Sequence, residues 1–222
     1  MAIAAMADDH IATSVSTLSF KNQFVASGIV PEVIAALDPS VSFYASYKAG
    51  ADSHDALLTP GSSLSISEAT MPFEFSVENL NNATNITAQT RFLIYLVCLT
   101  WSHSWAVWPC LTHPVRISSH ALPQLDADAP ARSTPTARNL RHYLAGNYTR
   151  AGTNSTVLST AQRLSIQSGQ SRPFTQFTNP NPEPNTGVHR FIYALYVQPA
   201  RFNTAGFESV GMEAETSNWN VS

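Results

Sequence analysis

Two uninterrupted apolar runs, Arg91 to Val97 and Val188 to Gln198, constrain the fold of this chain more than any other feature. Runs of this length that are rich in aromatic and aliphatic residues are typical of strands in the middle of a sheet. The second run places alternate residues on one face before Pro199 ends it: Phe191, Tyr193, Leu195 and Val197. We therefore expect a mainly β domain with few helices.

Shorter patterns near the start of the chain predict one helix and one further strand. Phe20 and Phe24 are four residues apart and Gly28 follows them, which predicts a short helix that ends at the glycine. Ile29 to Ile34 predicts an extended segment. Val41 to Tyr47 is aromatic and β-branched, and it predicts a strand.

Later patterns add a turn, a strand and long connections. Pro60-Gly61 predicts a turn. Met71 to Val77 alternates apolar with polar residues, as a half-buried strand does. Residues 79–87 predict a polar loop. Residues 145–187 are rich in Gly, Ser, Thr, Asn and Pro, so we expect them to form long connections around short strands.

Length and charge set limits on the domain and its partners. The 222 residues suffice for one domain with a substantial core. Only 12% are charged and the net charge is -3, so the chain lacks the basic surface of a nucleic-acid-binding protein. There is no polybasic cluster or lipidation motif. We expect residues 1–19 to be a flexible segment and residues 20–222 to form a single domain.

The N-terminus and the glycosylation sequons bear on location. Met1 to Ala7 is apolar but has no basic residue, and Asp8-Asp9-His10 follows at once, so a secretory signal is incomplete. Five Asn-x-Ser/Thr sequons would suit an exported glycoprotein: Asn82, Asn85, Asn147, Asn154 and Asn220. We expect a secreted protein, with a cytoplasmic location as the alternative.

The segment from Cys98 to Leu125 differs from its surroundings. It holds both cysteines and three of the four tryptophans, and Arg116 is its only formal charge. A membrane span over residues 92–111 is one explanation, although Ser102, His103, Ser104 and Pro109 interrupt it. A surface loop closed by a Cys98–Cys110 disulfide is a second, and a site where Cys and His bind a metal is a weaker variant of it.

A third explanation is that residues 97–124 are a translated intron. Val97-Cys98 can be encoded by GTATGT, a common 5′ splice signal, and Gln124 by CAG, a 3′ acceptor. Residues 97–124 are 28 codons in frame. Their removal would join the strand that ends at Leu96 directly to Leu125 and Asp126. If the segment is translated, we expect impaired ligand binding and a marginally stable domain.

Two carboxylates and two imidazoles suggest an anion pocket. Asp126 and Asp128 lie in one short motif, and His142 and His189 adjoin predicted strands. A carboxylate beside an imidazole favours the charged imidazolium, which can donate to a phosphate oxygen. Each feature alone also has a structural explanation, because Asp-x-Asp commonly forms a turn and a lone histidine is commonly packed in a core.

In this order, the motifs of the chain resemble those of the phosphatidylethanolamine-binding protein family, particularly its fungal secreted members. The similarity runs from about Phe20 to Gln198. It rests on Ile29-Val-Pro-Glu-Val-Ile34, Leu58-Thr-Pro-Gly61, Asp126-Ala-Asp-Ala-Pro130, Arg141-His-Tyr-Leu144, and the stretch from Pro182 through Gly187-Val-His-Arg-Phe191. The resemblance implies a β-sandwich-like domain in which a large antiparallel sheet packs on a smaller one, with a few short peripheral helices. From the resemblance, we expect the helix and strand that end the family fold to be missing after Asn220.

The resemblance also implies the ligand-binding residues. Asp126, His142 and His189 would contact the ligand, and Asp128 and Pro130 would shape the pocket wall. Pro182 and Phe191 complete the expected set. Phe191 stands where the family commonly has tyrosine, so one hydroxyl is lost. Arg190 is expected to be a structural partner for a buried acid such as Asp128 rather than a ligand contact.

Function follows from this resemblance as an expectation. We expect a non-enzymatic protein that binds phosphate-bearing head groups, either of a phosphatidylethanolamine-like phospholipid or of a phosphorylated ligand. The alternative is inhibition of a serine protease or carboxypeptidase, or regulation of signalling, through protein contact. The sequence has no Gly-x-Ser-x-Gly, phosphate-loop or His-Glu-x-x-His motif. If the protein were an enzyme, Asp126, His142 and His189 could form a triad that binds a metal ion. We expect no cofactor, no metal, no nucleic acid partner and no transmembrane span.

Overall fold

The structure is a computed structural model of the 222-residue chain. It describes residues 12–32, 36–48, 55–62, 64–65, 67–100, 106–110, 141–166, 173–180, 189–200 and 202–203. For residues 32, 97–100, 106–110 and 189 it describes the backbone but not the side chain.

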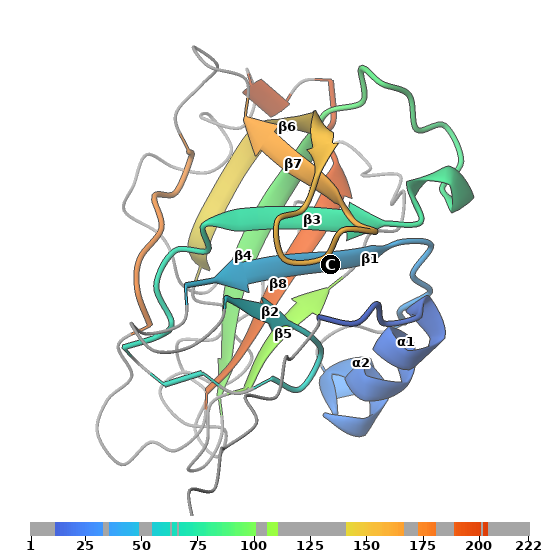
Figure 1. The fold of residues 1–222 in the computed structure, drawn as a ribbon. Helices are drawn as coiled ribbons and strands as arrows, with labels where there is room; N and C mark the ends of the chain where they lie inside the picture. Colours follow the sequence, from blue (N-terminus) through green and yellow to red (C-terminus); the bar gives the residue numbers. More distant parts are fainter. Residues whose placement is uncertain are drawn as a thin grey trace, which may run out of the picture.

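Eight strands dominate the described residues, with two short helices at one side (Figure 1). The helical elements are α1 (Thr17–Ala26), α2 (Ile29–Glu32) and the 3-10 turn η1 (Leu80–Asn82). The strands are β1 (Ser42–Tyr47), β2 (Ala56–Leu58), β3 (Glu74–Glu78), β4 (Phe92–Thr100), β5 (Ala106–Cys110), β6 (Arg141–Asn154), β7 (Gln162–Ile166) and β8 (His189–Val197). The expected mainly β fold is confirmed.

All eight strands belong to one sheet in the order β2-β1-β3-β7-β6-β4-β8-β5. Every neighbouring pair is antiparallel except β5 and β8, which are parallel. The sheet curls so that β1 and β2 contact β5 at its other end. The described residues therefore form one curled sheet rather than the expected large sheet packed on a smaller one. The two apolar runs become β4 and β8, which both lie in the interior of the sheet, as predicted, and pair with each other.

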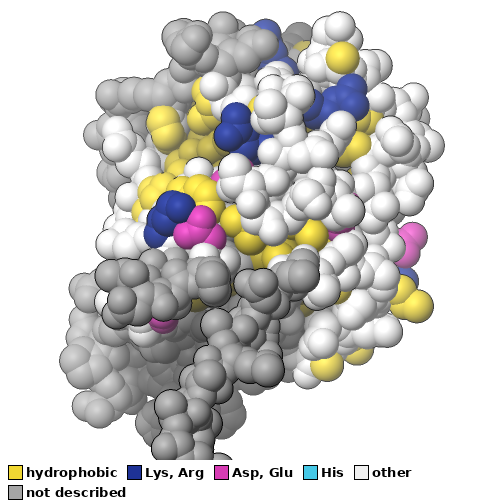
Figure 2. All heavy atoms as spheres, in the orientation of Figure 1, with side chains coloured by type: hydrophobic (Ala, Val, Ile, Leu, Met, Phe, Trp, Pro, Cys, Tyr) yellow, Lys and Arg dark blue, Asp and Glu magenta, His cyan; other side chains and the backbone are white. Residues whose placement is uncertain are grey.

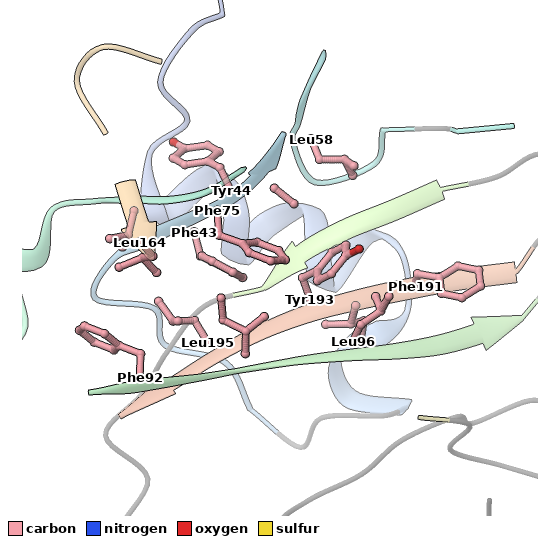
Figure 3. Close-up of a cluster of buried hydrophobic side chains, with 14 of the residues drawn as sticks. Phe43, Tyr44, Leu58, Phe75, Phe92, Leu96, Leu164, Phe191, Tyr193 and Leu195 are labelled. Atoms are coloured by element: carbon pink, nitrogen blue, oxygen red, sulfur yellow. The ribbon is translucent and has the colours of Figure 1, made fainter. Parts of the chain in front are cut away.

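The main core fills the inside of this curl. Phe191, Tyr193 and Leu195 lie on the same side of β8 and are buried, with Phe43 and Phe75 of β1 and β3 across from them (Figure 3). Aromatic contacts join the two sides, since the Phe75 ring centroid lies 5.5 Å from that of Tyr193. The predicted alternation along β8 is thus confirmed. The opposite face of β4, β6 and β8 carries a second, smaller cluster that includes Phe174 and Phe202.

The predicted first helix is confirmed as α1. Ser16 is its N-cap and its hydroxyl accepts from the backbone N–H of Ser19. Gly28 follows with a φ of 74°, which a glycine adopts without strain. The segment after it differs from the expected extended conformation, because Ile29–Glu32 is assigned as a short helix, although Val30 within it is extended.

Strand β3 is buried on both faces, so the prediction of a half-buried strand is wrong. Glu74 and Glu78 are only 5% and 6% exposed. The connection between β6 and β7 crosses β3 towards β1 (Figure 1) and covers the face that was expected to meet water. Ser155 and Thr156 donate to the Glu74 carboxylate, and Thr160 donates to that of Glu78. The alternation along one strand gives no sign of contacts with a loop that follows 81 residues later in the chain.

Strand β6 is the longest strand, with 14 residues, where only short strands and connections were expected. Asn147 and Gly152 within it adopt left-handed φ angles of 61° and 73°. These residues let the strand bend while it continues to pair with β4 and then with β7. The composition that predicted loops therefore supplies the bends of a long strand.

Part of the atypical segment forms strands. β4 continues through Cys98 to Thr100, and Ala106–Cys110 forms β5. Strand β8 lies between them, with Cys98 opposite Phe191 on one side and Cys110 opposite Ala194 on the other. Strands on either side of a third are about 10 Å apart, whereas a disulfide needs Cα atoms within about 7 Å. The structure does not bring Cys98 and Cys110 together.

The segment does not form the helical membrane span considered above, since residues 92–100 and 106–110 are strands. None of the helices in the described part of the chain has the length and apolar character that a bilayer crossing needs. On the face shown in Figure 2, charged side chains occur at scattered points among uncharged groups.

Candidate functional site

The candidate site is organised around His142 on β6. Leu96 of β4 pairs with Tyr143, but the next residue, Val97, pairs with Arg141. His142 is therefore the extra residue of a β-bulge. Bulges re-aim a side chain relative to the regular alternation of a strand. The His142 side chain is only 5% exposed.

A loop segment fixes the His142 imidazole. Residues 173–180 run beside the first part of β6, where Thr175 forms an isolated antiparallel bridge with Leu144. Thr178 then makes two bonds to His142. Its backbone N–H donates to the His142 carbonyl at 2.9 Å, and its carbonyl oxygen lies 2.9 Å from Nδ1. Because a carbonyl only accepts, Nδ1 carries a hydrogen.

The other ring nitrogen, Nε2, is buried and has no hydrogen-bond partner among the residues that the structure describes. The ring meets Phe191 of β8 edge to face, with 5.2 Å between centroids. Thr178, which contacts the opposite ring nitrogen Nδ1, is itself exposed. Buried polar atoms in proteins are nearly always paired, and an unpaired one calls for an explanation such as a ligand. In this arrangement one nitrogen of the imidazole has a hydrogen bond, the other is available to a ligand, and the ring packs against Phe191.

Burial lowers the pKa of His142 below its ordinary value, because desolvation disfavours the imidazolium; the bond to the Thr178 carbonyl acts in the opposite direction. The neighbouring Arg141 is also buried, at 4% exposure, and desolvation lowers its pKa as well, against an opposing effect of Tyr95. Arginine nevertheless remains charged in proteins. The site thus has a neutral imidazole on His142, and the residue that precedes it in the chain, Arg141, is a cation.

Paired tyrosines form the core next to Phe191. The hydroxyls of Tyr47 and Tyr193 are 2.6 Å apart, and those of Tyr143 and Tyr148 are 2.7 Å apart. Desolvation raises the pKa of Tyr193 well above its ordinary value. These phenols therefore stay protonated at neutral pH, and each hydroxyl is satisfied by its neighbour. They support the wall of the site rather than supply a reactive group.

Arg190 has a structural partner in the described part of the chain, the backbone carbonyl of Ser27. Its guanidinium Nη1 donates to the carbonyl of Ser27, the C-cap of α1, at 2.8 Å. A cation at a helix C-terminus also interacts favourably with the helix dipole. Arg190 therefore joins β8 to the helical edge. Asp128, its expected partner, lies outside the described residues.

Of the seven predicted ligand-binding residues, the structure brings His142 and Phe191 together. Asp126, Asp128, Pro130 and Pro182 lie outside the described residues. His189 begins β8 opposite Thr100, and its side chain is outside the description. Their roles remain predictions.

Thr178 is the residue that sequence reasoning missed. It acts on His142 through its backbone, so its side chain type gives no signal. In the sequence, the aromatic residue Phe177 just before Thr178 is a hint that this loop packs on the domain. In the structure, its ring centroid lies 6.2 Å from that of Tyr143 on β6. Among the described residues, no group of His, Cys, Asp and Glu is arranged to hold a metal ion.

A family model described as phosphatidylethanolamine-binding protein matches residues 105–222, which is more than half of the chain. The chain belongs to this family. The match contains both His142 and Phe191, the two described residues of the candidate site. The phosphatidylethanolamine-binding protein family is a family of binding proteins by its description, and the mainly β fold agrees with it.

Proposed function

We propose that this protein binds an anionic, phosphate-bearing ligand at His142. The candidates are the head group of a phospholipid such as phosphatidylethanolamine and a phosphorylated small molecule or peptide. The observation that carries the proposal is the buried, unpartnered Nε2 of His142 against the Phe191 ring. Family membership supports it, because the family is described by the binding of such a phospholipid.

The chemistry of the site suits a phosphate oxygen. A protonated imidazole donates a charge-assisted hydrogen bond, which is shorter and stronger than a neutral one. The bond between Nδ1 and Thr178 fixes the ring, so Nε2 meets the ligand without loss of rotamer freedom. The edge of Phe191 supplies an apolar wall for the part of the ligand that carries no charge. Asp126 and His189 are proposed to complete the contact.

Titration with phosphoethanolamine, followed by NMR, tests the proposal. We expect shifts centred on the His142 ring and the Thr178 amide, and loss of these shifts in His142→Asn. Lys21→Gln serves as a control, because it changes an exposed ion pair between Lys21 of α1 and Asp38. Binding that persists unchanged in His142→Asn would place the ligand elsewhere.

The variant His142→Asn also distinguishes ligand binding from the alternative function. Inhibition of a serine protease or carboxypeptidase, or control of a signalling protein, would act through a protein contact surface rather than through a buried nitrogen. If the purified protein inhibits such an enzyme and His142→Asn inhibits equally well, the function lies outside the candidate site.

We also propose that the protein is exported and carries N-linked glycans. Asn82, Asn85 and Asn154 are exposed, and the first two lie in the loop that follows β3. Asn147 is only 2% exposed, and its Nδ2, the atom to which a glycan would be attached, donates to Oδ1 of Asn203 at 3.2 Å. A glycan on Asn147 would disrupt this buried contact and could not fit in the fold.

Secretion from a eukaryotic cell, glycan removal and peptide mass spectrometry test this proposal. We expect modified peptides at one or more of the exposed sequons and an unmodified Asn147. A secreted, folded protein with no modified asparagine would contradict it, as would a glycan on Asn147.

A further inference from the structure

The tautomer of His142 is set by its surroundings. The Thr178 carbonyl is 2.9 Å from Nδ1 and can only accept, so the hydrogen of the neutral ring is on Nδ1. A flip of the ring would place a carbon against this carbonyl and lose the bond. Nε2 of the neutral ring therefore carries a lone pair, and it is the nitrogen without a partner.

A lone pair at Nε2 is the wrong group for an anion. The oxygens of a phosphate diester are acceptors only, so they cannot form a hydrogen bond to an unprotonated nitrogen. The imidazolium has an N–H at both nitrogens and can donate to the Thr178 carbonyl and to the ligand at the same time. The ring cannot offer a different donor by rotating without losing the bond from Nδ1 to the Thr178 carbonyl, and the backbone bond between Thr178 and His142 keeps that carbonyl in place.

We propose that an anion enters this site together with one proton, which stays on Nε2 of His142 while the anion is bound. The proton comes from water or buffer and returns there when the anion leaves, so no covalent bond forms or breaks in the ligand. This coupling rests on the proposed function and adds a dependence of ligand binding on pH. The protein would load a phosphate diester in mildly acidic surroundings and release it as the pH rises.

The charges around His142 do not replace this proton. The elements packed against it carry eight ionisable side chains that the structure describes: Arg141, Tyr143, Tyr148 and Arg150 on β6, Tyr95 on β4, and Arg190, Tyr193 and Tyr196 on β8. The segment 173–180 has none. None of the eight is among the causes that shift the pKa of His142, which are desolvation and then the Thr178 bond. Burial therefore holds the free site in the neutral form that repels an anion.

The test uses dimethyl phosphate, a phosphate diester with no group that titrates near neutral pH, and the full chain. NMR of the labelled His142 ring gives its pKa with and without the ligand, and titrations between about pH 5 and pH 8 give the affinity. We expect the ligand to raise the pKa of His142. Above the pKa of the free site, we expect the affinity to fall about tenfold for each unit of pH, as the uptake of one proton requires.

Two isosteric variants sharpen the result. In His142→Asn the side-chain amide can still donate to the Thr178 carbonyl but leaves no group at the position of Nε2, so we expect the diester not to bind. In His142→Gln the amide reaches the position of Nε2 as a permanent donor. We expect it to bind weakly but with an affinity that does not change with pH.

The outcomes separate the two proposals. If the diester binds the wild-type site with the same affinity across the pH range, the proton coupling is wrong and the proposed function stands. If the affinity changes with pH but the pKa of His142 does not move, the proton goes elsewhere and the coupling to His142 is wrong. If no binding occurs at any pH and the His142 resonances do not respond, the proposed function fails and the coupling fails with it.

Discussion

His142 and Tyr193 are both ionisable and both buried, and burial shifts their pKa values in opposite directions. The reason is the same in each case, because a dry environment disfavours the charged form, which is the protonated form of histidine and the deprotonated form of tyrosine. Tyr193 is thereby kept as a hydrogen-bonding core residue. His142 is kept neutral until a group such as a bound anion stabilises its positive charge.

This shift makes stability depend on pH through His142. The unfolded histidine titrates near its ordinary value of about 6.5, while the folded one stays neutral to lower pH. As the pH falls below that value, the unfolded state binds more protons, so the free energy of unfolding falls. Urea titrations in a buffer free of phosphate and sulfate should show a smaller loss between about pH 7 and pH 5.5 for His142→Asn than for wild type. Parallel losses would contradict the shift.

The tyrosine pair makes a second prediction at this scale. Tyr193→Phe removes one hydroxyl and leaves that of Tyr47, which is 3% exposed, without its 2.6 Å partner. We expect a loss of about 1–3 kcal/mol in the free energy of unfolding. The double variant with Tyr47→Phe should lose less than the two single losses added together. Chemical denaturation of the four proteins measures this, and additive losses would mean that the pair does not interact.

At the scale of elements, the sequence predicted those that are decided by local pattern. Strands β1, β4 and β8 follow from apolar runs, and α1 follows from the spacing of Phe20 and Phe24 and from Gly28. Strand β6 was missed because a bent strand that is rich in glycine and asparagine has the same composition as a loop. The burial of Glu74 and Glu78 was missed because it depends on a distant connection, and no local period reports such a contact.

That connection is held by carboxylates, which gives a prediction for Glu74. Its carboxylate accepts from the backbone N–H and the hydroxyl of Thr156, each at 3.2 Å, and from the hydroxyl of Ser155. Glu74→Gln replaces one acceptor oxygen with a donor that faces these donors. We expect faster amide hydrogen exchange at Thr156 and a loss of about 1–3 kcal/mol in stability.

Glu68→Gln is a matched control for Glu74→Gln. Glu68 accepts a similar backbone bond, from Ser65 at 2.8 Å, but lies in an exposed turn. We expect little change in exchange at Thr156 in this variant. Equal effects of the two substitutions would mean that burial of Glu74 has no special role.

At the scale of the whole molecule, the candidate site depends on where the end of β4 leads. Leu96 pairs with Tyr143, next to His142. If residues 97–124 were absent, Asp126 would follow Leu96 by two positions and would continue β4 alongside Arg141 and His142. The family motifs predicted His142 and Phe191, which the structure brings together, but the placement of Asp126 beside them needs the register of β4 and β6.

A chain without residues 97–124 tests the role of this segment. We expect it to melt at a higher temperature and to bind phosphoethanolamine more tightly than the full chain, because the acidic motif would then adjoin His142. Calorimetry and the NMR titration measure the two quantities. Equal values would show that the segment does not impair the site. A lower melting temperature would show that β5, which pairs with β8, contributes to the fold.

The position of β8 has a consequence for synthesis of the chain on the ribosome. It separates β4 from β5, although it is translated after both. Until it emerges, the nascent polypeptide presents two unpaired strand edges, each a template for pairing with another chain. We therefore expect the nascent chain to be prone to pairing with other chains until β8 lies between β4 and β5.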